Sequence, residues 1–370
     1  MKNKILIIGQ LPPPYHGSNV MAKIMLSVLR KQGYDIIFIN KSFAKSIDTI
    51  GKPSLRKILR IPILAVKTLF TCLLKRPSMC IYFVAVGKSA FLVDAFLIYL
   101  IHFCHLPYIL RFGGKGYREL QNENFFYNFL VSITLSNALG GIVLGQTIKR
   151  DVNNFIPDDR LVFVPNGTAN HPLIPIKKND RYVQILYLSN LVPTKGSFEV
   201  LMAAKIIIQK QHNVRFVFAG ADSAKFFTQK LRSYIVDNGL DEYVSMVGQV
   251  YGKKKEELFS TSDIFVFPTY FKREIFGNVN VEAMSWGLPV ISSNEGVISE
   301  IVKDGITGFI VDPKSPDEIA DKIVYLVNNP ELRYKMGMNG RKKFESKYTL
   351  EAHAKFLTDA IRYFLDFKKN

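Results

Sequence analysis

Residues 263–312 read DIFVFPTYFKREIFGNVNVEAMSWGLPVISSNEGVISEIVKDGITGFIVD. The apolar run at residues 264–267 predicts a buried strand, and a helix is expected to begin near Asn278. Gly287 stands where a helix commonly ends in the left-handed conformation, and residues 288–292 predict the next strand. The stretch therefore predicts a strand, a helix and a second strand of an α/β fold.

Two carboxylates lie around the start of this helix. Glu274 precedes it, and Glu282 lies in its first turns. The first backbone amides of a helix have no intrahelical acceptor, so they form an anion site between the two carboxylates. A ligand with a phosphate on these amides and hydroxyl groups on either side suits the layout. The pattern therefore indicates a nucleotide sugar.

The composition is that of a folded protein with more than one domain. The chain has 370 residues, of which 48% are hydrophobic and 22% charged, which excludes a disordered chain. Its three cysteines, Cys72, Cys80 and Cys104, have no metal-type spacing and favour a reducing, cytoplasmic compartment. The histidines form no ligand cluster and no Asp-x-Asp pair is present, so we expect neither a metal nor another cofactor.

No signal peptide or membrane span is expected. The apolar run within residues 1–9 is too short for a signal sequence. Residues 95–110 (AFLIYLIHFCHLPYIL) are the most membrane-like, but they fall short of the roughly 18 residues of a spanning helix and contain Pro107. A buried helix that runs into a strand is the expected structure there.

The positive charge is concentrated in the first half of the chain. The formal net charge is +18, and residues 1–170 contain 21 Lys and Arg against 8 Asp and Glu. Residues 54–76 (SLRKILRIPILAVKTLFTCLLKR) mix this charge with aliphatic residues. Two interpretations stay open: a pair of core helices with solvated lysines, or peripheral contact with an anionic membrane face. We expect no nucleic-acid partner, because no recognised binding motif accompanies the charge.

The chain begins with an α/β unit. Residues 4–9 predict a buried parallel strand, and the following loop, GQLPPPYHGS, lacks the glycine fingerprint of NAD- or FAD-binding proteins. Gly17, just before an expected helix, would let the backbone approach a phosphate, unless the loop is an ordinary turn. His16 beside it is either a ligand contact or an incidental loop histidine. Further strands are expected at residues 35–39, 79–84, 108–112, 141–143 and 161–164.

A glycine-rich loop follows the strand at residues 108–112. Gly113, Gly114 and Lys115 would lie at the carboxyl end of that strand, where open α/β sheets bind ligands. We consider these residues candidates for the acceptor side, with a flexible turn as the alternative.

A second α/β series follows residues 168–180, a polar, proline-bearing segment expected to link two domains. The loops after its strands should meet at one edge of the sheet, which would bring Lys195 and Gly248 near Glu274. Lys195 precedes a helix start and is a candidate phosphate ligand, with a solvated surface lysine as the alternative. Strands are expected at residues 184–188, 214–219, 244–247 and 264–267, and helices from residue 317, at 330–348 and at 350–367.

In this order the motifs resemble family 4 of the retaining nucleotide-sugar glycosyltransferases, which have the GT-B fold. The resemblance implies two Rossmann-like domains with mostly parallel sheets facing a cleft. Residues 1–170 would bind the acceptor, residues 181–348 the nucleotide sugar, and residues 349–370 would form a helix that returns to the first domain. The motifs are Glu274-x7-Glu282-Ala283-Met284, Gly287-x-Pro289-Val290, Asp304-Gly305-x-x-Gly308, Pro165-Asn166-Gly167 and Lys195-Gly196.

The resemblance also implies roles for individual residues. Lys195 would neutralise the diphosphate and Glu274 would contact the donor sugar, so these two are the expected catalytic residues. Glu282 would bind the ribose, Gly248 would flank the base, and Gly17 would approach the phosphates. The remaining donor-binding residues, of which the last three offer backbone amides to the diphosphate, are Phe276, Gly277, Asn278 and Val279.

Two positions depart from the family pattern. Asn190 stands where the family usually has an arginine that clamps the phosphates, and Arg273 or Lys272 is the candidate replacement. The loop Phe112-Gly113 also lacks a sugar-contacting histidine that many members carry.

The expected function is that of a retaining, metal-independent hexosyltransferase. It would move a sugar from a nucleotide sugar to an acceptor hydroxyl, with a lipid-linked glycan of O-antigen lipopolysaccharide or capsule as acceptor. It would act in the cytoplasm or at the cytoplasmic face of the inner membrane. One alternative is a nucleotide-sugar epimerase of the same fold, and another is a non-catalytic basic protein that binds a membrane or nucleic acid.

Overall fold

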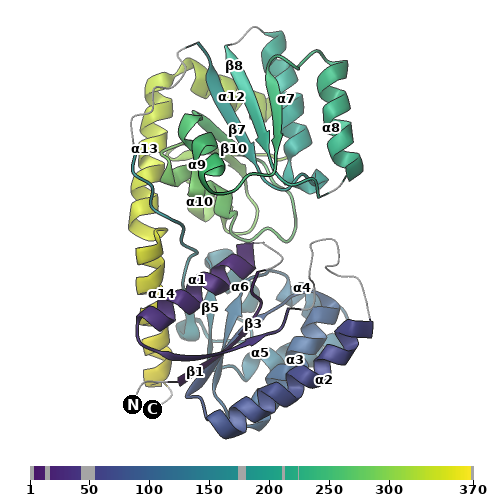
Figure 1. The fold of residues 1–370 in the computed structure, drawn as a ribbon, viewed down its shortest axis with the longest axis vertical. Coiled ribbons are helices and arrows are strands. Elements are labelled where there is room, and N and C mark those ends of the chain that lie inside the picture. Colours follow the sequence, from purple (N-terminus) through teal and green to yellow (C-terminus); the bar gives the residue numbers. More distant parts are fainter. Residues whose placement is uncertain are drawn as a thin grey trace. The chain divides into compact units, whose positions relative to one another are not determined.

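The structure is a computed structural model that describes residues 4–12, 17–42, 55–173, 181–210, 213–223 and 225–367. The chain forms two compact units, each built around a six-stranded sheet (Figure 1). Met1–Asn166 and Glu351–Asn370 make the first unit, and Gly167–Leu350 make the second. The second unit is therefore inserted into the chain of the first.

The sheet of the first unit is parallel throughout, in the order β2-β1-β3-β4-β5-β6. Its central strands are buried apolar runs, as parallel strands covered on both faces require. Every strand expected from the sequence is present. The strands are β1 (Lys4–Gly9), β2 (Asp35–Asn40), β3 (Met79–Val84), β4 (Tyr108–Phe112), β5 (Gly140–Val143) and β6 (Leu161–Phe163).

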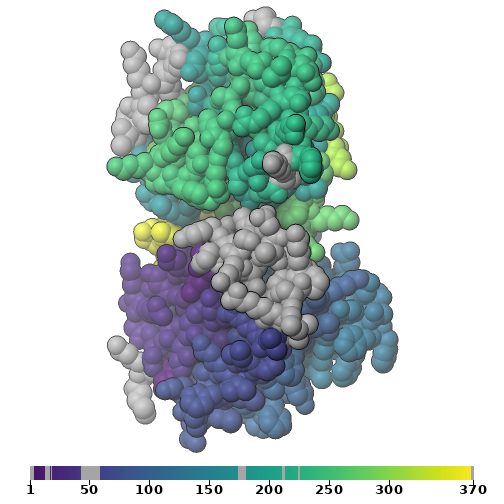
Figure 2. Space-filling model, turned by 45° about the vertical axis from the view of Figure 1, so that its right-hand side comes forward, coloured from purple at the N-terminus to yellow at the C-terminus, as the bar shows by residue number. Residues whose placement is uncertain are grey.

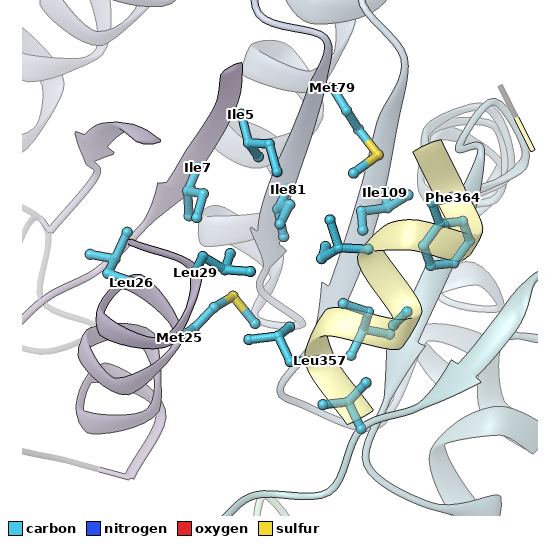
Figure 3. Packing of buried hydrophobic residues seen from close by; sticks show 14 of the residues in the cluster. Ile5, Ile7, Met25, Leu26, Leu29, Met79, Ile81, Ile109, Leu357 and Phe364 are labelled. Carbon is cyan, nitrogen blue, oxygen red and sulfur yellow. The ribbon is translucent and has the colours of Figure 1, made fainter. Parts of the chain in front are cut away.

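One face of this sheet is covered by α1 (Gly17–Lys31) and α14 (Leu350–Phe367). Figure 3 shows Met25 of α1 and Leu357 and Phe364 of α14 packed against Ile81 and other side chains of the strands. Because α14 follows the whole second unit in the chain, the core of the first unit is completed only by the end of the sequence. The expected return of the last helix is confirmed.

The opposite face is covered by α2 (Leu55–Phe70), α3 (Lys88–Phe103) and α5 (Phe125–Ser136). The strand order explains why these helices lie on this face. The connection from β1 to β2 runs in one direction along the sheet, and the later connections run in the opposite direction. Because such connections are right-handed, the helices of the later connections lie on the other face from α1. In this layer α2 packs on α3, and α3 packs on α5. Shorter elements complete the unit, namely the π-helical turn η2 (Thr71–Lys75), α4 (Tyr117–Gln121), α6 (Gln146–Val152) and the 3₁₀ turn η3 (Asp158–Arg160).

The buried helix expected within residues 95–110 is α3, which ends shortly before β4 begins. Its apolar residues are divided between a buried side and an exposed side. No helix in the described ranges combines the length and the apolar character needed to cross a membrane.

The sheet of the second unit is also parallel, in the order β12-β11-β10-β7-β8-β9. The sequence did not predict β12, a short edge strand that starts at a glycine and gives little periodic signal. The strands are β7 (Val183–Leu188), β8 (Val214–Ala219), β9 (Val244–Gly248), β10 (Ile264–Phe267), β11 (Val290–Ser293) and β12 (Gly308–Val311).

The second unit contains the helix that the sequence predicts between the two candidate carboxylates. The helix expected near Asn278 begins at that residue, and Gly287 beyond its end has a φ of 68°. The elements are the 3₁₀ turn η4 (Pro193–Lys195), α7 (Ser197–Gln209), α8 (Lys225–Asp237), α9 (Gly252–Thr261), α10 (Asn278–Ser285), α11 (Ile298–Ile301), α12 (Pro316–Asn328) and α13 (Pro330–Lys347).

The described part of the expected linker packs on the second unit. Thr168 forms a β-bridge with Thr349, and the His171 ring stacks on Trp286 with their centroids 4.6 Å apart. Arg341 donates a hydrogen bond of 2.8 Å to the main-chain oxygen of His171. The chain therefore leaves the first unit directly after Asn166, and residues 168–171 do not form a free connection.

Candidate functional site

The site begins with an ion pair at the carboxyl edge of the second sheet. Lys195 follows β7 and Glu274 follows β10, and Lys195 Nζ bonds Glu274 Oε2. Both side chains are largely buried, with 16% and 14% exposed. Lys195 Nζ also lies 4.7 Å from the centre of the Phe271 ring. The structure thus joins the two residues that were expected to be catalytic.

The second oxygen of Glu274 reaches the start of α10. Glu274 Oε1 accepts a hydrogen bond of 3.1 Å from the backbone nitrogen of Gly277. Gly277 is left-handed, with a φ of 61°, and a Cβ there would lie 2.7 Å from Asn280 Nδ2. A glycine is therefore needed for α10 to begin so close to Glu274. The carboxylate lies between a cation and the amino end of a helix.

The first turn of α10 carries the positive end of the helix dipole. It contains Asn278 and Val279, both half-buried, and the contact of their backbone amides with a diphosphate stays a prediction. Asn280 beside them is fully buried, and neither its amide oxygen nor its amide nitrogen has a hydrogen-bond partner within the described residues. Buried polar groups are usually paired, so this amide marks the start of α10 as unusual.

Glu282 has a partner that the sequence did not reveal. Lys255 of α9 donates a hydrogen bond of 2.8 Å to Glu282 Oε1, and about a quarter of each side chain is exposed. Lys255 belongs to the run Lys253-Lys254-Lys255, whose sequence is typical of a solvated helix face. Lys255 reaches Glu282 because α9 begins shortly after β9, at the carboxyl edge of the sheet.

The backbone around Lys195 is held by close contacts between loops. Gly196 has a φ of 83°, and a Cβ there would lie 2.2 Å from the main-chain oxygen of Pro268 after β10. The hydroxyl of Tyr187 donates a hydrogen bond of 3.1 Å to the main-chain oxygen of Lys195. These contacts fix the main chain of the lysine, so that its side chain is positioned before a ligand arrives.

The other donor-side candidates differ in how they are placed. The Phe276 side chain is buried and packs edge-on against Tyr348, at 5.9 Å between ring centroids, and a contact of this residue with the donor stays a prediction. Gly248 ends β9 with a φ of 72°, and no atom lies within 4 Å of a Cβ added there. Asn190 and Arg273 are exposed, as is Lys272. Replacement of the family arginine by Arg273 or Lys272 therefore stays a prediction.

The site candidates of the first unit belong to both sides of the expected site. Gly17, which was expected to approach the donor phosphates, is the exposed first residue of α1, and that approach stays a prediction. The acceptor-side candidate His16 lies outside the described residues. Gly113, Gly114 and Lys115 form the loop between β4 and α4, where Gly113 is exposed and the other two are half-buried. Their contacts with an acceptor stay predictions.

Asp151 occupies the amino end of α4, next to this loop. Its carboxylate accepts hydrogen bonds from the backbone nitrogens of Gly116, Tyr117 and Arg118, at 2.6, 3.0 and 3.1 Å. An anion of the chain itself therefore binds these amides, and the sequence did not predict this role for Asp151.

The described part of the chain contains no group of three or more His, Cys, Asp or Glu residues arranged to hold a metal ion. Two cations pair with the expected donor-binding carboxylates: Lys195 with Glu274, and Lys255 with Glu282.

Comparison with known proteins decides the family. The family described as "Glycosyl transferases group 1" matches residues 174–343. The glycosyltransferase MJ1607 of Methanocaldococcus jannaschii is 32% identical over 275 residues, which are 69% of this chain and 69% of that protein. The chain belongs to this glycosyltransferase family. The resemblance inferred from the motifs at residues 263–312 is thereby confirmed.

Another relative of this glycosyltransferase is the capsular polysaccharide biosynthesis glycosyltransferase CapM of Staphylococcus aureus. It is 33% identical over 253 residues, which are 64% of this chain and 65% of CapM. The match thus leaves about a third of CapM uncovered.

Solved structures confirm the GT-B fold of the glycosyltransferase. A glycosyltransferase from Rickettsia africae superposes with a TM-score of 0.78 at 18% identity, covering 100% of this chain and 99% of that one. Anabaena HepE in complex with UDP and glucose superposes with a TM-score of 0.73 at 14% identity, covering 98% and 100%. Both likenesses extend over the two units.

Proposed function

We propose that the protein is a retaining glycosyltransferase that moves a sugar from a nucleoside diphosphate sugar to an acceptor hydroxyl without a metal ion. The carrying observation is the arrangement of Lys195, Glu274 and Gly277 at the amino end of α10. A cation, a hydrogen-bond acceptor and a helix start meet there, and these are the groups that a sugar diphosphate needs.

The diphosphate would bind at the first turn of α10 and compete with Glu274 for Lys195. Fixed donors stabilise a leaving diphosphate because negative charge develops on it as the bond to the sugar breaks. Lys195 supplies a full charge, and the amides of Asn278 and Val279 supply the dipole of the helix. The same phosphate would receive the proton of the acceptor hydroxyl, on the side of the sugar from which it departs.

Glu274 would then hold the donor sugar. Its carboxylate lies beside the helix start through the hydrogen bond from Gly277, so it can accept hydrogen bonds from sugar hydroxyls next to the diphosphate. We assign it to positioning of the donor sugar and not to nucleophilic attack. Glu282, held by Lys255, is the matching acceptor for the ribose hydroxyls.

UDP is the first donor nucleotide to test, because the superposed HepE structure was solved with UDP and glucose. For the acceptor we propose a lipid-linked glycan of a surface polysaccharide, such as O-antigen or capsule. This choice rests on the relative CapM, whose name places it in capsular polysaccharide biosynthesis. The reaction would take place at the cytoplasmic face of the membrane, where nucleotide sugars and lipid-linked intermediates meet.

The test is an assay of the purified protein with UDP-, GDP-, ADP- and dTDP-sugars and extracted lipid-linked glycans. We expect release of nucleoside diphosphate with one donor, dependent on acceptor, and a product with the anomeric configuration of the donor. Glu274→Gln should lower the rate of transfer by roughly a hundredfold or more while the circular dichroism spectrum is unchanged. Glu331→Gln, at an exposed carboxylate of α13, is the matched control and should retain activity.

The assay also separates the alternatives. Conversion of a donor to its epimer without acceptor would show an epimerase. If the folded protein neither binds nor converts any donor, while it binds membranes or nucleic acid in a salt-dependent manner, the proposal is wrong.

A further inference from the structure

Three helices of the first unit present large hydrophobic side chains to solvent. These are α2, α3 and α5, which lie next to one another on one side of the sheet (Figure 1). More than half of the exposed large hydrophobic side chains in the described residues lie on these helices and on η2, which continues α2. Single exposed hydrophobic residues are common, but a contiguous group indicates a binding surface.

The exposed side chains follow the same spacing on each helix. On α2 they include Ile63, Val66 and Phe70, so that the second and third follow the first by one and by two turns. The buried residues Leu64 and Thr68 of α2 lie on its other side. The exposed stripe of α2 therefore points away from the sheet.

The helices α3 and α5 carry exposed stripes with the same spacing. The stripe of α3 contains Phe96, Tyr99 and Phe103, and the stripe of α5 contains Phe126, Phe129 and Ile133.

Because all three helices cover one face of the sheet, their outer sides form one surface, whose α2 portion is dark blue in Figure 2. We call this surface the apolar face and define it by Ile63, Val66, Phe96, Phe103, Phe126 and Phe129.

The chain beside the apolar face is positively charged. Residues 49–93 contain no aspartate or glutamate, and α5 contains no charged residue at all. Lys67, Lys75 and Arg76 are exposed on α2 and directly after it. Lys67 is one turn from Ile63 and from Phe70, so its ammonium group lies at the edge of the hydrophobic stripe.

The carboxylates in this part of the unit are mostly neutralised. Asp94 of α3 is buried and forms an ion pair with Lys41. Glu123, before α5, forms an exposed ion pair with Lys88. Glu119 on α4 is the further exposed carboxylate in this region. The charge around the apolar face is therefore positive overall.

We propose that the apolar face docks on an anionic phospholipid surface, with its aromatic and aliphatic side chains in the headgroup region and the lysines at the lipid phosphates. Amphipathic surfaces that combine hydrophobic side chains with basic flanks bind such membranes. A second copy of the chain fits less well, because it would bring an equally positive flank. The inference rests on the first unit alone and is independent of the donor chemistry.

The experiment is cosedimentation of the full chain with vesicles of phosphatidylcholine, with and without phosphatidylglycerol. The wild-type protein should bind the vesicles that contain phosphatidylglycerol, and less so in high salt. The variant Ile63→Ser/Phe103→Ser/Phe129→Ser removes one side chain from each helix and should bind at least about tenfold more weakly. The matched control, Phe226→Ser/Val236→Ser/Tyr334→Ser, changes similarly exposed residues of the second unit and should bind as wild type.

A second variant, Lys67→Gln/Lys75→Gln, should lower vesicle binding and the salt dependence of that binding without changing the apolar face. If the triple variant does not fold, this variant alone tests the proposal. The proposal is overturned if the wild type does not bind these vesicles, or if both variants bind as it does. If light scattering shows a dimer that the triple substitution dissociates, and no vesicle binding is found, the apolar face binds a second copy of the chain. Donor turnover is measured in a separate assay, so the vesicle-binding result can be interpreted even if the proposed function is wrong.

Discussion

Lys195 Nζ and Glu274 Oε2 form a largely buried ion pair between residues 79 positions apart in the chain. Parallel pairing of β7 with β10 brings their following loops to the same edge, and Gly196 allows the two loops to touch. The other oxygen of Glu274 accepts the backbone N–H of Gly277. One carboxylate thus connects the proposed phosphate ligand with the helix that would hold the phosphates.

Replacing Lys195 should affect the rate of transfer more than the stability of the fold. Lys195→Met removes the cation from the leaving diphosphate and should lower kcat by roughly 10²–10³. Combining it with Glu274→Gln should lower the rate by less than the product of the single effects, because the residues act as a unit. Lys210→Met, at an exposed lysine after α7, is the control. Equal rates for Lys195→Met and Lys210→Met would remove Lys195 from the mechanism.

Lys255 should act on donor binding. It pairs with Glu282, so Lys255→Met frees that carboxylate and weakens its hold on the ribose. We expect a KM for the donor several-fold higher, on the order of 1 kcal/mol of lost binding, with kcat nearly unchanged, as for an interaction made equally in ground and transition states. Lys254→Met alters the exposed neighbour in the same lysine run and should change neither constant. A loss confined to kcat would contradict this role.

Acidification should destabilise the first unit through His353. Burial lowers the pKa of His353 in α14 to about 4, while the hydrogen bond between its Nδ1 and the Pro165 oxygen, at 2.7 Å, opposes the shift and Arg111 adds to it. The folded pKa lies below that of the unfolded chain, so the unfolded chain binds more protons between pH 6.5 and 4. The free energy of unfolding therefore includes a contribution from neutral His353 that is present above pH 6.5. This contribution, up to about 3 kcal/mol, is lost as the pH falls towards 4.

Urea unfolding of wild type and His353→Gln between pH 7 and pH 4 measures this contribution. The wild type should lose more stability than the variant over that range. The exposed His102 provides the control, because His102→Gln should keep the wild-type slope. Parallel curves for wild type and His353→Gln would show that His353 does not titrate as expected.

The buried pair of Lys41 and Asp94 should contribute to stability only as a pair. Asp94 also accepts hydrogen bonds of 2.7 Å from the Tyr82 hydroxyl and from the Ala85 backbone nitrogen. Lys41→Met leaves this carboxylate without its cation and should cost about 3–5 kcal/mol.

Two further variants check this prediction by denaturant unfolding. Lys41→Met/Asp94→Asn should recover part of the lost stability, because no uncompensated charge remains. Lys88→Met breaks the exposed pair with Glu123 and should cost far less than Lys41→Met, because solvent screens an exposed ion pair. Similar losses for Lys41→Met and Lys88→Met would refute the argument.

Much of the fold is readable in the sequence, because parallel strands are continuous apolar runs bounded by glycine, proline or polar residues. The strands at residues 79–84, 108–112, 214–219 and 264–267 have the predicted ends. The missed strand β12 is short and begins at Gly308, whose φ of 152° suits a turn as well as a strand. Its place is set by pairing with β11.

Helical periodicity has a similar limit. An apolar stripe on a helix predicts that one side is buried, but it does not say which side when both sides carry large hydrophobic residues. In α3 both sides do, and only the packing on the sheet shows that Phe91 and Ile98 are inside while Phe96 and Phe103 are outside. The two interpretations of residues 54–76 were left open for the same reason.

The sequence by itself determined the local elements, the start of α10 at Asn278 and the residue types of the proposed donor site, because these depend on near neighbours in the chain. The tertiary structure decided which charges meet. The sequence predicted that Lys195 would lie near Glu274, because loops after parallel strands meet at one edge of a sheet, but only the tertiary structure shows that the two form an ion pair. The contact of Lys255 with Glu282 was not predicted, because nothing in the lysine run at residues 253–255 distinguishes one lysine from its neighbours.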